Sequence, residues 1–190
     1  VMYLFGNKEA DLVKKIRKNG TRIIEFFNKT ERERLTTTLF AGDPQKGIRE
    51  VIRKDLGCDI KIPFGYRLVM NNPEFFWVRQ FNPKDDRNVF IYRTEYRKPE
   101  QFQKDSLIAL RDKICRKYLF EDPEKADTYL LTETAVSFKP VLTRPVTHAG
   151  NYGHEMQGLW RNNNYGMGGP FISLVVLDPE KKYLYYVEGF

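Results

Sequence analysis

Residues 66–81 read YRLVMNNPEFFWVRQF and predict two strands joined by a tight turn. Apolar and aromatic residues lie on both sides of Asn71-Asn72-Pro73-Glu74, whose residue types favour turns. A second turn-like segment, residues 82–88, separates this hairpin from the strand-like run Val89-Phe90-Ile91-Tyr92. Since strands joined by short connections pair antiparallel, we expect a three-stranded meander.

Before the meander, the sequence first predicts a buried strand at Val1–Phe5, which is apolar and β-prone. Asn7 suits the N-cap of a helix, and Asn19-Gly20 suits its end. A second helical pattern follows, within which Thr30 and Glu33 form the Thr-x-x-Glu pattern of a capping box. We therefore expect a break in this region and not one continuous helix.

Asp43-Pro44 predicts the start of a further helix, because Asp suits the N-cap and Pro the first helical position. Its apolar residues recur at helical spacing, and they are Ile48, Val51, Ile52 and Leu56. Gly57 is expected to end it. The spacing then changes to alternation over residues 60–64, which predicts that the first strand of the meander already begins there.

Phe102–Phe120 is predicted to be a helix that packs an apolar stripe on the sheet and ends before Pro123. Tyr129-Leu130-Leu131 begins a strand. Residues 137–147 contain two prolines, Pro140 and Pro145, so we expect a connecting segment there.

The remaining chain predicts a strand over residues 148–160, a Gly/Asn-rich loop over residues 161–170, and a hairpin of Phe171–Leu177 with Lys182–Glu188. Together these elements predict one α+β domain over residues 1–190, with a mostly antiparallel sheet and helices packed on one face. The order of elements also allows two halves, residues 1–98 and 99–190, each related to a ferredoxin-like split βαβ unit.

The chain has 190 residues, a net charge of +7 and a pI near 9.3, which would suit an anionic partner. Basic and acidic residues interleave throughout, however, which favours a solvated surface. Arg and aromatic residues alternate at Trp77–Phe81 and Tyr92–Arg97, but without an RNP-like motif, so nucleic acid is not the expected partner. No apolar run reaches the roughly 20 residues of a membrane-spanning helix.

Cys58 and Cys115 lie far apart in sequence, in neither CxxC nor metal-ligand spacing. Two buried thiols are favoured over one disulfide, which an oxidising compartment would allow.

Both histidines of the chain lie close together, and they offer the strongest candidates for catalysis. In a continuous strand His148, Tyr152 and His154 would share one face, with Glu155 adjacent. Such a group could bind a metal or act as acid and base, although metal sites usually need three or four ligands. Structural or ligand-contact roles are the favoured alternative, and we expect neither a metal nor another cofactor.

The stretch from Tyr152 to Phe171 also collects residue types that bind partners by stacking and adaptable hydrogen bonding. The candidate ligand-binding residues are Tyr152, Trp160, Arg161, Asn163, Tyr165 and Met167. The glycines of Gly166–Pro170 do not form a phosphate-binding loop, since the segment leads into a strand and lacks the required Lys-Ser/Thr.

Two motifs carry a resemblance to a known family: Glu155, Gly158, Leu159 and Trp160, followed by Met167–Phe171. With the segments Ile62-Pro63-x-x-Tyr66, Phe76-Trp77 and Tyr129, they resemble the domain of unknown function 4837 family, which comprises predicted envelope lipoproteins of Bacteroidetes. Gln157 departs from the Arg expected before Gly-Leu-Trp.

The resemblance implies an exported, lipid-anchored protein of the periplasm or outer membrane, of which this sequence is a fragment. It implies no activity and no catalytic residue. We therefore expect a non-enzymatic envelope module that binds a protein or glycan partner through residues 152–171. The alternative is an envelope hydrolase or metal-dependent enzyme that uses His148, His154 and Glu155.

Overall fold

The structure is a computed structural model that describes residues 1–42, 45–83, 86–119, 127–164, 166–178, 180 and 182–190. The chain divides into two compact units. The first comprises residues 1–46 and 61–64, and the second comprises residues 47–60 and 65–190.

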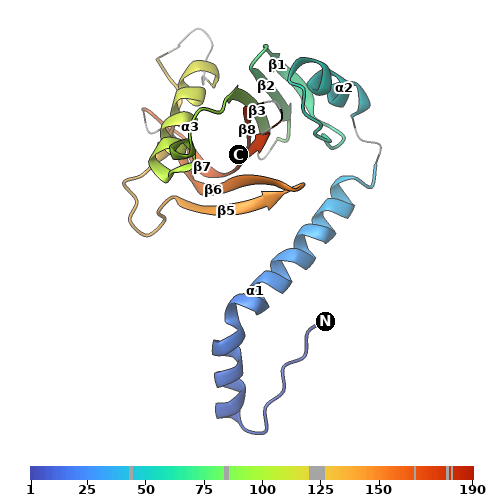
Figure 1. The fold of residues 1–190 in the computed structure, drawn as a ribbon, viewed down its shortest axis with the longest axis vertical. Helices are drawn as coiled ribbons and strands as arrows, with labels where there is room; N and C mark the ends of the chain where they lie inside the picture. The colour runs from blue at the N-terminus through green and yellow to red at the C-terminus, as the bar shows by residue number, and fades with distance from the viewer. Residues whose placement is uncertain (43–44, 84–85, 120–126, 165, 179, 181) are drawn as a thin grey trace. The chain divides into compact units, whose positions relative to one another are not determined.

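The first unit is dominated by α1, a single helix from Glu9 to Leu39 (Figure 1). The predicted break is therefore wrong. Asn19 does not end a helix and Thr30 does not cap a new one, because their side chains donate hydrogen bonds to the carbonyls of Lys15 and Phe26, one turn earlier in the same helix. The predicted cap is also displaced, since the N-cap residue is Lys8.

The predicted strand at Val1–Phe5 is likewise wrong, because these residues have no strand partner and most are exposed. A lone strand cannot satisfy its backbone hydrogen-bonding groups without a neighbour. No helix in the described part of the chain is both long and apolar enough to cross a membrane.

The second unit contains an eight-stranded sheet in which all the paired strands are antiparallel (Figure 1). The strands are β1 (Arg67–Asn71), β2 (Phe75–Gln80), β3 (Arg87–Glu95), β4 (Leu130–Glu133), β5 (Leu142–His148), β6 (Asn151–Asn162), β7 (Gly168–Asp178) and β8 (Tyr183–Gly189). Their order is β1-β2-β3-β8-β7-β6-β4, and β5 also pairs with β6. The predicted α+β class and antiparallel sheet are confirmed.

The meander of β1, β2 and β3 is confirmed, but its first strand begins only at Arg67. Residues 60–64 are not a strand. Two breakers explain the late start, because Pro63 has no N–H for a ladder and Gly65 has a φ of +92°.

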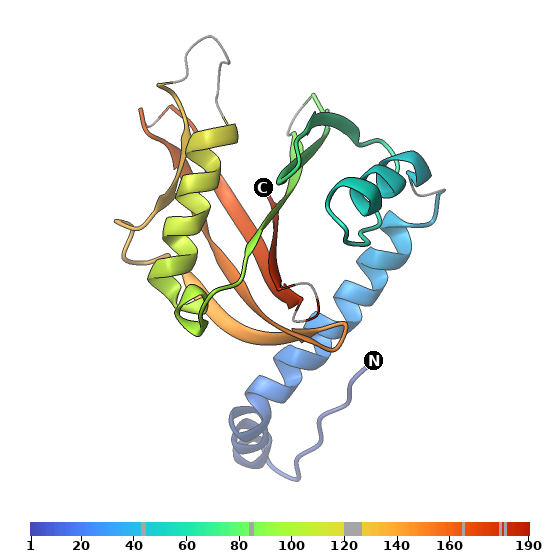
Figure 2. The same ribbon diagram turned by 45° about the horizontal axis from the view of Figure 1, so that its top comes forward.

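The predicted helix after the meander is confirmed as a short 3-10 turn, η1 (Pro99–Phe102), followed by α3 (Lys104–Tyr118). Figure 2 shows α3 running across one face of the sheet. Leu107 and Ile114 are buried there against a core that includes Phe75 and Tyr186. The predicted helix end near Pro123 lies outside the described residues.

A further predicted helix is confirmed as α2 (Lys46–Asp55), although its predicted start at Asp43-Pro44 lies outside the described residues. Gly57 follows it with a φ of +76°, as expected of a helix stop. The carbonyl of Leu56 accepts hydrogen bonds from Arg93 and Tyr185, whose side chains leave the sheet on the side opposite to Tyr186. The C-terminal end of α2 therefore meets the face of the sheet that α3 does not cover.

The segment over residues 137–147 is not simply a connection, because Leu142–His148 forms β5. Pro145 is tolerated because β5 pairs only with β6. The expected loop over residues 161–170 is also shorter, since Arg161 pairs with Gly168 and Trp160 with Gly169. A Cβ added at Gly169 would lie 3.0 Å from Trp160 Nε1, so this glycine leaves room for the indole.

The split βαβ unit that the order of elements allowed in each half is not what the described residues form; they contain one wider unit. Strand β3, helix α3 and strand β4 follow one another, and β8, β7 and β6 lie between the two strands. Because each neighbouring pair is antiparallel, β3 and β4 run in the same direction. A ferredoxin-like unit has one strand between them.

An ion pair lies inside this core, since Arg111 and Glu188 are both 0% exposed. Arg111 Nη2 donates to Glu188 Oε1 at 2.8 Å, and Arg111 Nη1 donates to Thr132 Oγ1 at 3.2 Å. Tyr186 donates its hydroxyl to Glu188 Oε2 at 2.6 Å, and the guanidinium carbon lies 4.0 Å from the centre of the Phe171 ring. Every charged group of the pair is thus hydrogen-bonded, as burial requires.

Candidate functional site

The structure does not bring His148, His154 and Glu155 together. His148 pairs with Asn151 across the β5–β6 hairpin, whose turn is Ala149-Gly150, so the chain reverses between the two histidines. Paired residues share a face, which places His148 and Glu155 on one face of the sheet and His154 on the other. In the described part of the chain, no three His, Cys, Asp or Glu residues gather as metal ligands.

His154 and Tyr152 do share a face, as expected. Tyr152 Oη lies 2.9 Å from His154 Nε2 in a hydrogen bond, and both rings pack against Phe102 with centroid distances of 5.0 and 5.3 Å. Burial lowers the pKa of His154. The imidazole is therefore kept neutral in an aromatic cluster, which favours a packing role over proton transfer.

Glu155 is 8% exposed and belongs to an ion pair with Arg144 on β5. Arg144 Nη2 donates to both carboxylate oxygens at 2.9 Å, and Gln157 Nε2 donates to Oε1 at 2.7 Å. Through these bonds Glu155 ties the edge strand β5 to β6.

The structure brings only some of the remaining candidates together, since Trp160, Arg161 and Met167 line one small pocket. Trp160 is half-buried against the core, with its ring 5.8 Å from that of Phe190, and Arg161 forms an ion pair with Glu133 at 3.0 Å. Asn163 accepts a hydrogen bond from the N–H of Tyr129 at 3.0 Å. Of the candidates beyond β6, only Met167 is described as exposed, at 51%, and Tyr165 lies outside the described residues.

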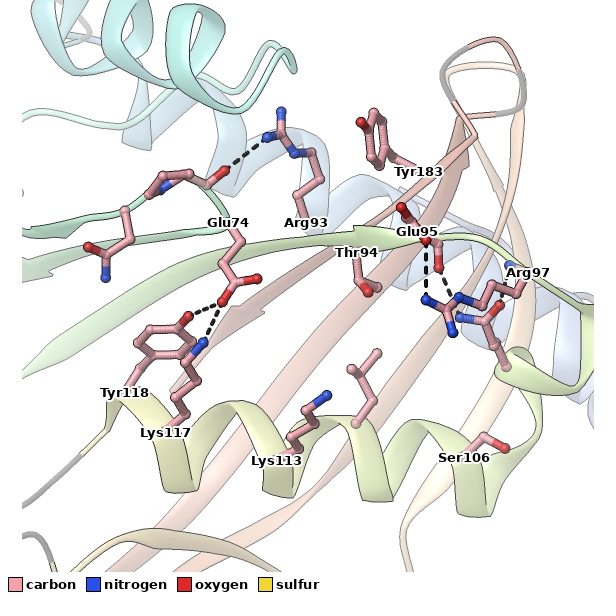
Figure 3. Close-up of a pocket in the computed structure, with 14 residues that line it drawn as sticks. Glu74, Arg93, Thr94, Glu95, Arg97, Ser106, Lys113, Lys117, Tyr118 and Tyr183 are labelled. Atoms are coloured by element: carbon pink, nitrogen blue, oxygen red, sulfur yellow. Dashed lines mark hydrogen bonds and ion pairs between the residues drawn. The ribbon is translucent and has the colours of Figure 1, made fainter.

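A different site emerges on the second unit, which we call the cationic groove (Figure 3). It has a volume of about 910 Å³ and lies among α3, β3, the β1–β2 turn and the start of β8. Its lining residues are Asn72, Pro73, Glu74, Arg93, Thr94, Glu95, Arg97, Gln101, Ser106, Leu110, Lys113, Lys117, Tyr118 and Tyr183. Four of them are cationic and two are anionic.

One end of the groove is closed by an ion pair. Glu74 Oε1 accepts hydrogen bonds from Lys117 Nζ and Tyr118 Oη, each at 2.5 Å. These bonds, that of Lys117 first, lower the pKa of Glu74 and raise the pKa of Lys117. Glu74 therefore stays ionised at neutral pH.

The other end holds Arg97 and Glu95 as an exposed ion pair at 3.3 Å. Gln101 fixes the backbone there, because its Oε1 accepts from the N–H of Arg97 at 2.6 Å and its Nε2 donates to the carbonyl of Glu95 at 3.2 Å. These two hydrogen bonds hold the backbone of Glu95 and Arg97 in place at this end of the groove.

Two further cations line the groove, on opposite sides of β3 (Figure 3). Arg93 donates to the carbonyls of Leu56 and Pro73, at 2.8 and 2.9 Å, and its guanidinium lies 5.1 Å from the Tyr183 ring centre. Lys113 is exposed on α3, and no ion pair in the described part of the chain involves either Lys113 or Arg93. The groove can therefore offer positive charge to a ligand.

Sequence reasoning missed this groove because its residues come from four separate segments. One signal was available: Ser106, Leu110, Lys113 and Lys117 follow one another at intervals of four, three and four residues. That spacing places them on one side of a helix. Figure 3 shows Ser106, Lys113 and Lys117 on the side of α3 that faces β3.

The fold and this site define an α+β module with an open, cation-rich groove. The sequence profile described as Domain of unknown function (DUF4837) matches residues 45–190, so the chain belongs to this family. The matched region contains α2 and all eight strands, while α1 lies before it. No curated protein matches the chain.

Proposed function

We propose that this protein is a non-enzymatic binding module that holds an acidic glycan in the cationic groove. The resemblance to predicted lipoproteins of Bacteroidetes adds a location, the cell envelope, with a lipid anchor elsewhere in the protein. We favour the groove over residues 152–171 as the contact surface, because Trp160 packs against the core and Arg161 is paired with Glu133.

The charge of the groove carries this proposal. Two of its cations form ion pairs with Glu74 and Glu95, whereas neither Lys113 nor Arg93 forms an ion pair among the described residues, although the charge of Lys113 helps to lower the pKa of Glu74. An ionised ligand group beside Lys113 would gain a charge-assisted hydrogen bond, which is about twice as strong as a neutral one.

The polar groups of the groove favour a sugar over a peptide. Thr94, Ser106 and Asn72 supply two hydroxyls and an amide that match a ligand rich in hydroxyl groups. An extended peptide would instead pair with a free strand edge. At Thr94 and Glu95, β3 pairs with β8 alone, but the Glu95 carbonyl already accepts a hydrogen bond from Gln101. The volume of about 910 Å³ fits a ligand of several rings.

The lowered pKa of Glu74 favours binding over hydrolysis in the groove. Glycoside hydrolysis uses two carboxyl groups, one of which has a raised pKa and donates a proton. Glu74 has the opposite property, since Lys117 and Tyr118 lower its pKa. A hydrolase built on His148, His154 and Glu155 is not supported either, because these side chains lie on two faces of the sheet.

Calorimetric titration with trigalacturonate, and with maltotriose as a neutral ligand of the same length, tests the proposal. We expect heat only with trigalacturonate and weaker binding as salt screens the exposed cations. Lys113→Gln should weaken binding about tenfold to a hundredfold, the loss of one hydrogen bond to a charge. Lys104→Gln, on the same helix outside the groove, should bind like the wild type. Equal affinity for the two sugars, or no effect of Lys113→Gln, would refute the proposal.

A further inference from the structure

The helix α1 has an apolar side that no residue of the first unit buries. None of its 31 residues is buried, and Val13, Ile16, Ile24 and Phe27 are 40, 42, 61 and 55% exposed. Their spacing is that of one helix face. Since helices in proteins gain most of their stability from packing such a face, α1 needs a partner surface.

The charges of α1 identify the chemistry of that surface. Residues 12–27, which hold this apolar side, contain five Lys or Arg residues and a single acidic residue, Glu25. Lys14, Lys18 and Arg22 recur at intervals of four residues and lie away from the apolar side. A helix with an apolar face, a basic polar face and no capacity to span a bilayer is suited to lie in a membrane interface.

The segment before α1 adds two exposed aromatic side chains to the first unit. Tyr3 and Phe5 are each 74% exposed, and their rings stack with centroids 6.2 Å apart. Lys15 Nζ donates to the carbonyl of Phe5 at 2.8 Å, which holds this segment beside the first turns of the helix (Figure 1). Aromatic side chains of this kind are favoured at the membrane–water boundary.

A second copy of the helix fits less well. Glu31 and Arg34 follow Ile24 and Phe27 by seven residues each, so they lie on the same side of α1, where they form an ion pair. A helix pair along this whole side would bury that ion pair, at a cost in desolvation. A membrane surface avoids the cost, because the helix can leave the interface after Phe27.

We propose that residues 1–27 form a membrane-surface element that binds anionic lipid bilayers through the apolar side of α1 and its basic flanks. This inference does not depend on the glycan proposal, since it concerns the other unit and another kind of ligand. The element lies on the bilayer and does not span it.

Co-sedimentation of the full chain with vesicles tests the proposal. We expect binding to vesicles of phosphatidylglycerol and phosphatidylcholine in equal parts, at least tenfold tighter than to phosphatidylcholine alone. Ile24→Gln should weaken binding about tenfold, since one buried Ile side chain contributes about that much. Lys18→Gln should weaken it about fivefold, the contribution of one cation near an anionic surface.

Phe26→Gln is the matched control, because Phe26 lies outside the apolar side and its loss should change binding less than twofold. Circular dichroism of each variant would verify that α1 stays helical. No binding to anionic vesicles at low salt, or equal losses for Ile24→Gln and Phe26→Gln, overturns the proposal. If Lys113→Gln abolished vesicle binding and Ile24→Gln did not, the binding would belong to the groove. If the chain formed a dimer that Ile24→Gln abolished, the apolar side would belong to a contact with a second copy. Either result also overturns it.

Discussion

Replacing Arg111 by Met tests how far the core depends on its buried ion pair. The substitution keeps an unbranched side chain of similar length but removes the guanidinium that faces Glu188. The carboxylate would then be buried without a counter-charge, with only the Tyr186 hydroxyl left as a donor. Removing one partner of a buried pair costs about 3–5 kcal/mol.

In a chain of this size, a loss of about 3–5 kcal/mol lowers the melting temperature by about 6–20 °C. Urea unfolding followed by circular dichroism would measure the free energy, and thermal unfolding the melting temperature. The double variant Arg111→Met/Glu188→Gln removes both charges and keeps an acceptor for Tyr186. It should therefore recover about 2 kcal/mol or more of the loss.

The pH dependence gives a second readout of the same substitution. Burial already raises the pKa of Glu188, while Arg111 opposes the rise, so the pKa should rise further in Arg111→Met. When the pKa of a carboxyl in the folded protein exceeds its value in the unfolded chain, about 4.3, the protein loses stability as the pH rises from the lower pKa to the higher one. The deficit of the variant should thus be smaller at pH 5 than at pH 8. A loss below about 1 kcal/mol that does not vary with pH would refute this reasoning.

Three further predictions follow from the second unit. Glu74→Gln should lower stability at neutral pH by less than about 1 kcal/mol, because the ion pair of Glu74 with Lys117 is partly exposed. The pKa of Glu74 is lowered in the folded protein, so the difference in stability between the variant and the wild type, measured by urea unfolding, should vanish as the pH falls through that pKa. Burial raises the pKa of the Cys115 thiol, so a thiol reagent at pH 8 should modify Cys115 far more slowly in the native chain than in urea, and equal rates would contradict its place in the core. Gly153→Ala should lower stability by about 1–3 kcal/mol, because its Cβ would lie 2.4 Å from the Val175 carbonyl oxygen, whereas Gly47→Ala, with open space around it, should be neutral or stabilising in the same unfolding assay.

Local patterns were sufficient for the elements whose neighbours in sequence are also neighbours in space. The β1–β2 turn at Asn72-Pro73 and the stripe of α3 that contains Leu107 and Ile114 follow from turn chemistry and helical spacing. The hairpin of β7 and β8 follows in the same way. These signals act over fewer than ten residues, so the sequence displays them directly.

The errors arose where tertiary context overrides a local preference. Pro145 was expected to exclude a strand. It is tolerated because β5 is an edge strand, where the N–H that proline lacks is not needed for pairing on the open side. Asn19-Gly20 was expected to end a helix, but Asn19 bonds the carbonyl of Lys15 and α1 continues. His148 and His154 were placed on one strand face, and the Ala149-Gly150 turn between them separates them. None of these outcomes can be derived without knowing the neighbouring strands.

The cationic groove could be predicted only in part. The spacing of Ser106, Lys113 and Lys117 indicates a polar side of α3, but their meeting with Arg93 and Glu74 depends on strand order. β3 and α3 lie together in the fold, but the sequence between them, which contains η1, holds no pattern that indicates a groove. The charge of the site is therefore a property of the fold and not of any one motif.

Chemical-shift mapping of the full chain with trigalacturonate tests the central claim most directly, because it locates the ligand residue by residue. The account predicts that backbone amide signals of Thr94, Ser106 and Lys113 move with added trigalacturonate and stay unmoved with maltotriose. Shifts centred on Trp160 and Met167, with none in the groove, would contradict it and return the binding surface to residues 152–171.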